Sequence, residues 1–144
     1  MNESCRNIYQ IARNVAGLTQ LEASQKLSVS VRALGNYESG ITVPHGDVVA
    51  DMTEVYGTRW LGYEHLRQST NLGMEILPPI SIDDIAKSVL VLQKESSDVE
   101  DVKNCMVKIA CDGMIEDHET HRWDQVTKEV RELAGAALSV VFSR

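Results

Sequence analysis

The stretch from Leu18 to Gly40 constrains the fold more than any other part of the chain, because it encodes two short helices separated by a tight turn. Thr19, with Glu22 three residues later, forms the capping-box pattern that starts many helices. Ser30 is a favourable N-cap for a second helix, and Gly40 stands where a helix commonly ends. Two helices joined by so short a turn form a helix-turn-helix unit, which presents its second helix to a groove.

Several residues of this stretch, at fixed offsets from one another, resemble the Cro/CI-type (XRE) helix-turn-helix family. The resemblance covers about Ile8 to Leu66, which is under half of the chain. It is carried by Leu18-Thr19-Gln20, Lys26-Leu27, Val29-Ser30 and Asn36-Tyr37-Glu38-Ser39-Gly40. It implies a five-helix, lambda-repressor-like domain and a sequence-specific DNA-binding transcriptional regulator of the phage or mobile-element repressor type.

Apolar residues at helical spacing predict further helices on both sides of this motif. In the N-terminal part they cover residues 3–15, 44–57 and 59–66, with Val15 and Leu66 facing the core and Pro44 in a first helical turn. In the C-terminal part they cover residues 82–109 and 118–142, the former capped by Ser81 with Asp84. The expected fold is all-α: a five-helix lambda-repressor-like DNA-binding domain followed by a long C-terminal antiparallel helical hairpin.

Helix-breaking residues between the two parts predict a boundary there. We expect a helix-turn-helix domain over residues 1–67, a docked linker over 68–80 and the hairpin over 81–144. Residues 1–70 carry six Lys and Arg against seven Asp and Glu, a net charge of −1, and residues 71–144 carry eight against fourteen, a net charge of −6. Because attraction to phosphate dominates non-specific DNA affinity, we expect weak binding to DNA of arbitrary sequence.

The second helix of the motif carries the candidate base-contacting residues, which are Ser30, Val31, Arg32 and Asn36. In a helix-turn-helix, the N-terminal part of this helix meets base edges in the major groove of double-stranded DNA. Arg32 suits guanine O6 and N7, Asn36 suits adenine, and Val31 suits a thymine methyl group. Gly35 in the same helix has two interpretations, which are close approach to DNA and a helix that is short at this point.

The resemblance also implies roles for residues outside this helix. Gln20, together with Thr19, is expected to contact DNA phosphate at the start of the first motif helix, where backbone N–H groups attract an anion. Arg13 and Glu38 occupy the places of an arginine–glutamate pair that holds the reading helix to its domain in the phage repressors.

Three departures from the family pattern bear on DNA binding. Ser28 stands where the turn usually has glycine, and Ser24 stands where the first motif helix usually has alanine. The loop over residues 39–43 has no Lys or Arg, although the family often carries them there. The missing loop cations motivate an alternative function, an antitoxin-like or regulatory protein–protein interaction module with weak or lost DNA binding.

The two long helices of residues 81–144 each carry an apolar stripe that a single partner helix barely covers. We therefore expect a homodimer through residues 81–144, and a different protein partner is the second candidate for this surface. The alternative is that both helices fold back on the N-terminal domain.

We expect no metal, no cofactor and no enzyme. Residues 112–119 resemble the second half of a calcium loop, but Lys108 and Ala110 stand at the first ligand positions. Four further residues have side chains suited to zinc, namely Cys105, Cys111, His118 and His121. Their spacing matches no ordinary zinc finger. The sequence contains no phosphate-binding glycine loop and no nucleophile elbow.

The cellular context follows from three absences. No apolar run approaches the roughly 20 residues of a membrane helix. The segment MNESCRNIYQ lacks the apolar core of a signal peptide. Cys5, Cys105 and Cys111 form no dense disulfide pattern. We therefore expect a reduced, cytoplasmic protein without membrane contact.

Overall fold

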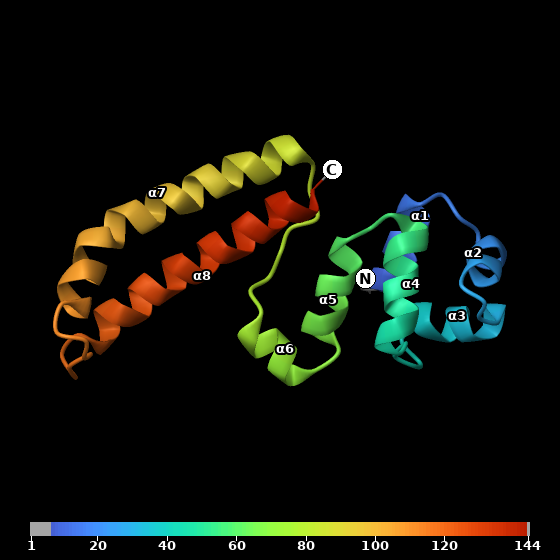
Figure 1. Cartoon of the computed structure of the whole chain (residues 1–144), viewed down its shortest axis with the longest axis horizontal. Helices are drawn as coiled ribbons and strands as arrows, with labels where there is room; N and C mark the ends of the chain where they lie inside the picture. Colours follow the sequence, from blue (N-terminus) through green and yellow to red (C-terminus); the bar gives the residue numbers. More distant parts are fainter. Residues whose placement is uncertain (1–6, 144) are drawn as a thin grey trace, which may run out of the picture. The chain divides into compact units, whose positions relative to one another are not determined.

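The computed structural model describes residues 7–143, and this part of the chain contains eight α-helices and no β-strand. The helices are α1 (Ile8–Val15), α2 (Gln20–Lys26), α3 (Val31–Glu38), α4 (Gly46–Tyr56), α5 (Trp60–Gln68), α6 (Asn71–Ile76), α7 (Ile85–Ala110) and α8 (Thr120–Phe142), as Figure 1 shows. The all-α prediction is confirmed. The chain divides into two compact units, called here the N-terminal unit (Met1–Leu77) and the C-terminal unit (Pro78–Arg144).

Helices α1 to α5 of the N-terminal unit enclose an apolar core. Leu34 of α3, Met52 of α4 and Leu61 of α5 are completely buried. The other buried apolar side chains of this unit are Tyr9, Ala12, Ala23, Leu27, Val49, Tyr56 and Trp60. Burying a large apolar side chain stabilises a fold by about 1.5–3 kcal/mol. Packing against several helices therefore fixes where α3 lies.

Two residues predicted to face this core lie at the surface instead. Val15 is 67% exposed and Leu66 is 63% exposed. The buried side of α1 consists of Tyr9, Ala12 and Arg13. Because an ion pair with Glu38 satisfies the guanidinium, Arg13 occupies an inward position, and this turns Val15 outward. On α5 the buried residues are Trp60, Leu61, Glu64 and His65.

Two helix starts differ from the sequence prediction. α4 has His45 as its N-cap, so Pro44 precedes the helix and is buried. α7 has Asp84 as its N-cap and begins later than a cap at Ser81 would place it. The reason is that the Asp84 carboxylate accepts a backbone N–H of the first turn at 2.9 Å. The predicted start of the first helix at Glu3 lies outside the described residues.

A short helix, α6, occupies residues that were expected to be a linker. It packs closely on α5, where a Cβ atom at Gly73 would overlap the backbone carbonyl oxygen of Leu66. Thr70 caps α6, because its hydroxyl oxygen accepts the Gly73 N–H at 2.9 Å. The sequence did not reveal this helix, since Gly73 indicates a turn unless its close approach to α5 is known.

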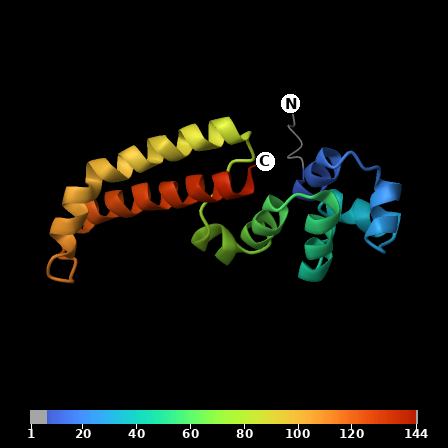
Figure 2. The same cartoon turned by 45° about the horizontal axis from the view of Figure 1, so that its top comes forward.

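The C-terminal unit is a hairpin in which α7 and α8 run antiparallel and side by side (Figures 1 and 2). Buried and half-buried residues, alternately three and four apart, form the seam between the two helices. The seam of α7 comprises Ser88, Leu92, Glu95, Val99, Val102, Met106 and Ile109, and that of α8 comprises Val126, Glu129, Leu133, Ala136 and Val140. Although both helices are long, no helix of the described chain has the length and apolar character needed to cross a membrane.

Residues 79–81 cover one side of this hairpin. A Cβ atom at Gly135 would lie 2.5 Å from the Pro79 carbonyl oxygen, and the Ser81 N–H donates to Ser139 Oγ at 2.9 Å. The same side holds a cavity of about 470 Å³, whose lining includes Val91, Glu132 and Ser139. Each of these three residues directly precedes a seam residue. We call this side of the hairpin the cavity side.

Candidate nucleic-acid interface

A tight turn joins α2 to α3. Leu27 ends α2 with a buried side chain, and Ser30 caps α3 because its Oγ accepts the Ala33 N–H at 3.0 Å. Between them Ser28 has a φ of 54°, the left-handed backbone conformation. This conformation costs a residue with a side chain about 1–2 kcal/mol. The cost explains why glycine is the usual residue at this place in the family.

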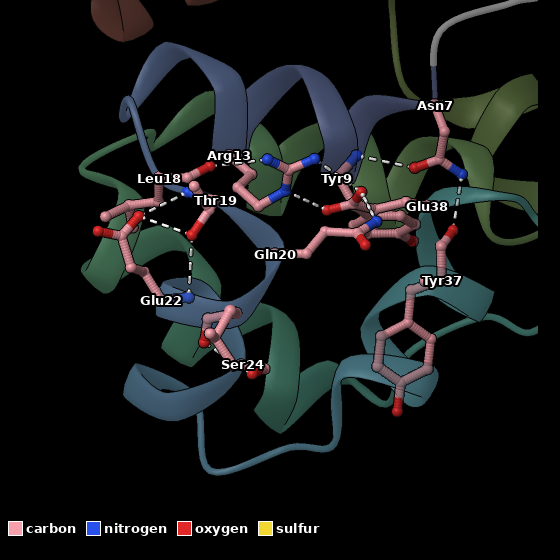
Figure 3. Close-up of polar contacts among 12 residues, drawn as sticks. Asn7, Tyr9, Arg13, Leu18, Thr19, Gln20, Glu22, Ser24, Tyr37 and Glu38 are labelled. Carbon is pink, nitrogen blue, oxygen red and sulfur yellow. Dashed lines mark hydrogen bonds and ion pairs between the residues drawn. The ribbon is translucent and has the colours of Figure 1, made fainter.

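The predicted capping box is present at the start of α2 (Figure 3). The Glu22 N–H donates to Thr19 Oγ1 at 3.2 Å, and the Thr19 N–H donates to Glu22 Oε2 at 2.8 Å. The hydrogen bond from the Thr19 backbone is the main cause of a lowered pKa of Glu22. The remaining N–H groups of this first turn have no partner within the helix, so the end of α2 is suited to a phosphate.

A buried ion pair connects α3 to α1 (Figure 3). Arg13 Nε donates to Glu38 Oε1 at 2.6 Å, and Arg13 Nη2 donates to Glu38 Oε2 at 2.9 Å. Arg13 Nη1 donates to the Leu18 carbonyl oxygen at 2.7 Å. Hydrogen bonding to Glu38 raises the pKa of Arg13. The structure thus brings together the two residues for which the resemblance implied a pair, in a two-pronged geometry that fixes orientation.

Gln20 belongs to the same network. Its Nε2 donates to Glu38 Oε2 at 2.8 Å, so the Glu38 carboxylate binds side chains from both α1 and α2 (Figure 3). Gln20 was expected to contact phosphate, and the sequence does not indicate this hydrogen bond, because it joins residues far apart in the chain. A phosphate contact at this place would use the second amide N–H of Gln20 or the backbone N–H groups of α2.

The side of α3 that faces away from the core carries the predicted base-contacting residues. Leu34 and Glu38 face inward. Arg32 is exposed, Val31 is 42% exposed, and Asn36 is half-buried. Arg32 and Asn36 are four residues apart and therefore share one side of the helix. The structure gathers Val31, Arg32 and Asn36 on one accessible surface.

The structure also explains two unusual residues of the motif, Gly35 and Ser24. α3 continues through Gly35, so the interpretation of a helix that is short there is wrong. Ser24 is 4% exposed, and its hydroxyl donates to the Leu21 carbonyl oxygen at 2.8 Å. Serine therefore replaces the usual alanine without leaving a buried hydroxyl group unsatisfied.

The loop after α3 exposes apolar side chains where the family often has cations. Ile41 is 71% exposed and Val43 is 65% exposed. Gly40 precedes them with a φ of 74°, which a residue with a side chain rarely adopts. This loop therefore adds no positive charge next to the reading helix.

Two further polar contacts support the domain behind α3. Asn7 caps α1, and its Nδ2 donates to the Tyr37 carbonyl oxygen at 2.9 Å (Figure 3). The Tyr9 hydroxyl and His65 Nδ1 are hydrogen-bonded at 2.8 Å. Burial raises the pKa of Tyr9 and lowers the pKa of His65. The position of Asn7 before Ile8 could have indicated the cap, whereas nothing in the sequence indicates the Tyr9–His65 contact.

Within residues 7–143, the group of side chains close enough to share a metal ion is Glu95, Glu129 and Glu132, with ligand oxygens within 4.8 Å of one another. Lys128 Nζ lies 3.4 Å from Glu129 and 3.3 Å from Glu132, and Lys94 Nζ lies 3.0 Å from Glu95. Ammonium groups therefore already compensate these carboxylates. The cysteine and histidine residues considered for zinc form no such group in the described chain.

Comparison with known proteins identifies the N-terminal unit. No curated protein and no solved structure matches the chain. Residues 10–61 match the family model described as helix-turn-helix, and this match contains the capping box, the Arg13–Glu38 pair and the whole of α3. Residues 10–61 thus form a helix-turn-helix domain of the Cro/CI type (XRE), and this domain supports a role in DNA binding and regulation.

Proposed function

We propose that this protein binds a specific sequence of double-stranded DNA through α3 and regulates transcription as a homodimer, in the manner of phage and mobile-element repressors. The observation that carries the proposal is the construction of α3. Glu38 at its inner side is bound by Arg13 and Gln20, while Val31, Arg32 and Asn36 lie on its accessible side. A rigidly held helix with free polar side chains is what base recognition in the major groove requires.

Each accessible residue has a defined partner in this proposal. Arg32 binds guanine O6 and N7, Asn36 binds an adenine edge, and Val31 contacts a thymine methyl group. Thr19 and Gln20 position the domain by binding phosphate at the start of α2, a contact that carries no sequence information.

The surface of the C-terminal unit supports dimerisation. The apolar side chains buried in this unit, within residues 78–143, are Ile109, Val126 and Ala136. So small a core is marginal for a folded unit of this length. Apolar residues remain exposed on both helices, among them Ile85 at 56%, Val89 at 38%, Val130 at 42% and Val141 at 59%.

Three of these exposed residues, Val89, Val130 and Val141, lie on the side of the hairpin opposite the cavity side. Val89, Val130 and Val141 directly follow seam residues, whereas Val91, Glu132 and Ser139 of the cavity lining directly precede them. In a pair of antiparallel right-handed helices, the residues one position after each seam residue lie on one side of the pair. The residues one position before each seam residue lie on the other side. We assign Val89, Val130 and Val141 to a contact with a second copy of the chain, since a two-fold contact joins a patch to itself. Glu100 and Lys103 on the same side pair with each other at 3.0 Å.

Selection from random double-stranded DNA at low salt tests DNA binding. We expect enrichment of a two-fold repeat whose half-sites are separated by about one helical turn, ~34 Å. Arg32→Ala should weaken binding to the enriched site by ~1–3 kcal/mol and relax the preference at one position. Gln20→Ala should weaken binding to all sequences about equally. An unchanged preference in Arg32→Ala would refute the role of this residue.

Light scattering on the full-length protein tests the dimer. Val89→Asp places a charge in the proposed contact and should give a monomer. Leu90→Asp is the matched control, because Leu90 is 65% exposed on another side of α7. A wild-type monomer, or equal behaviour of the two variants, would refute the proposed contact.

One observation favours a second function, that of a protein-binding module with little DNA affinity. The loop after α3 exposes Ile41 and Val43 and carries no cation, and residues 71–144 have a net charge of −6. Both features weaken attraction to phosphate. The same selection experiment distinguishes the two functions, because a protein-binding module would enrich no DNA motif.

A further inference from the structure

Five glycines lie within helices, namely Gly35, Gly46, Gly62, Gly73 and Gly135, and the structure shows why Gly73 and Gly135 are needed. A Cβ atom at Gly73 of α6 would overlap the Leu66 carbonyl oxygen, and one at Gly135 of α8 would lie 2.5 Å from the Pro79 carbonyl oxygen. A Cβ atom at Gly35 of α3 would meet no atom within 4 Å. Glycine in a helix interior costs about 0.5–1 kcal/mol relative to alanine. Nothing inside the described fold therefore requires glycine at position 35.

Gly35 lies on the accessible side of α3. It stands four residues after Val31 and four before Ser39, and this row runs beside the row of Arg32 and Asn36. The Ser39 hydroxyl donates back to the Gly35 carbonyl oxygen at 2.8 Å, so this side chain is held against the helix. The absent side chain leaves a notch between Val31 and Ser39, open to whatever α3 contacts. We call this the Gly35 notch.

We propose that the Gly35 notch receives the C5 methyl group of a thymine in the recognised DNA. The inference rests on the proposed function and adds a residue that determines specificity. The polar groups of the major groove require hydrogen-bonding partners, and its apolar group is the thymine methyl. The Gly35 carbonyl oxygen is not free, since both the helix and Ser39 use it. Val31, exposed by 42%, provides an apolar wall.

The notch predicts opposite effects of one substitution on folding and on binding. In Gly35→Ala the new methyl group meets no protein atom and improves helix propensity, so the fold should become more stable. The same methyl group fills the space that the thymine methyl needs, so DNA binding should weaken. A merely structural glycine would change both properties in the same direction.

The first measurement compares two glycine variants of the full-length protein on the DNA site enriched by selection. Gly46→Ala is the matched control, because a Cβ atom at Gly46 also meets nothing within 4 Å but lies on α4. We expect neither variant to lower the thermal midpoint. Gly35→Ala should bind the site about tenfold more weakly than wild type, and Gly46→Ala should bind it equally well. Equal binding by Gly35→Ala would overturn the notch and leave the proposed function intact.

The second measurement replaces each thymine of the site in turn by deoxyuridine, which lacks only the methyl group. At one thymine per half-site, the wild type should bind the deoxyuridine site more weakly, and Gly35→Ala should regain most of its lost affinity. A loss in Gly35→Ala that no deoxyuridine reverses would mean close approach to sugar or phosphate, and would overturn the assignment to thymine. If the wild type enriches no sequence at all, the proposed function fails together with the notch.

Discussion

Glu38 in the N-terminal unit and Glu95 in the C-terminal unit are both buried, with 7% and 9% of their surface exposed. The Glu38 carboxylate accepts three hydrogen bonds, two from Arg13 and one from Gln20. Glu95 pairs with Lys94, which is exposed, and its Oε2 is buried without a hydrogen-bond partner. The buried polar groups of α3 are thus satisfied within their own unit.

The units that contain these two glutamates also differ in where their apolar residues lie. The N-terminal unit has an apolar core contributed by α1 to α5, whereas the hairpin has polar residues in its seam and apolar residues outside it. Ser88 Oγ, in the same seam as Glu95, is also buried without a partner. Buried polar atoms without a partner also occur in the N-terminal unit, at Tyr56, Thr58 and Arg67, so the units differ chiefly in the size of their apolar cores. Four predictions test this difference, and the two tryptophans of the chain, Trp60 and Trp123, report on one unit each.

The largest effect is expected from Glu38→Ala. It leaves the Arg13 guanidinium buried without its carboxylate, which should destabilise the N-terminal unit by about 3–5 kcal/mol. Urea unfolding followed by Trp60 fluorescence, in a Trp123→Phe background, measures this loss. Lys94→Ala removes an exposed partner and should leave the same transition unchanged. A loss below about 1 kcal/mol would show that the ion pair does not hold α3 in place.

Gly135→Ala should destabilise the C-terminal unit by about 1–3 kcal/mol, because the added methyl group forces the Pro79 carbonyl away from α8. Trp123 fluorescence in a Trp60→Phe background reports this transition. Gly46→Ala, which meets no neighbouring atom, should not change it. If Gly135→Ala proves neutral, residues 79–81 are not held against the hairpin in solution.

Glu95→Leu should act in the opposite direction to Glu38→Ala and stabilise the C-terminal unit by about 1 kcal/mol. It removes a buried oxygen without a partner and adds an apolar side chain to the seam. Lys94 keeps its second partner, since its Nζ lies 2.8 Å from Asp98. Urea unfolding followed by Trp123 measures the change. Destabilisation by this substitution would mean that Glu95 has a partner that the hairpin alone does not supply.

The smallest effect is a dependence of the N-terminal unit on pH. Burial lowers the pKa of His65 below its ordinary value of 6.5, so the unfolded chain takes up a proton before the folded one does. This contribution to stability is complete above pH 6.5 and is lost as the pH falls through the lower pKa of the folded state. In the protonated ring Nδ1 can only donate toward the Tyr9 hydroxyl.

The measurement for His65 is the urea midpoint reported by Trp60 between about pH 7.5 and about pH 5.5. We expect the midpoint to fall on acidification in the wild type and in His45→Gln, whose histidine is exposed. His65→Phe should reduce the fall. An equal fall in all three proteins would assign the pH dependence to other groups.

The sequence by itself determined the features that depend on residues a few positions apart. The Thr19–Glu22 capping box, the Ser30 cap and the all-α class follow from hydrogen bonds and side-chain spacing within single helices. The resemblance added the pairing of Arg13 with Glu38, which no local pattern contains. The replacement of the usual glycine by Ser28 also concerns the local backbone, because Ser28 adopts the left-handed conformation.

Only the tertiary structure decided which side chains are buried together. Gln20 bonds to Glu38, Tyr9 bonds to His65, and Gly73 approaches α5, although the residues in each contact are separated in the chain. In the hairpin, Glu95 lies in the seam and Val89 lies outside it, an arrangement that the spacing of apolar residues does not indicate. The physical reason is that periodicity fixes which residues share a face of a helix. Packing against other elements decides which way that face turns, and burial then selects the polar groups that find partners there.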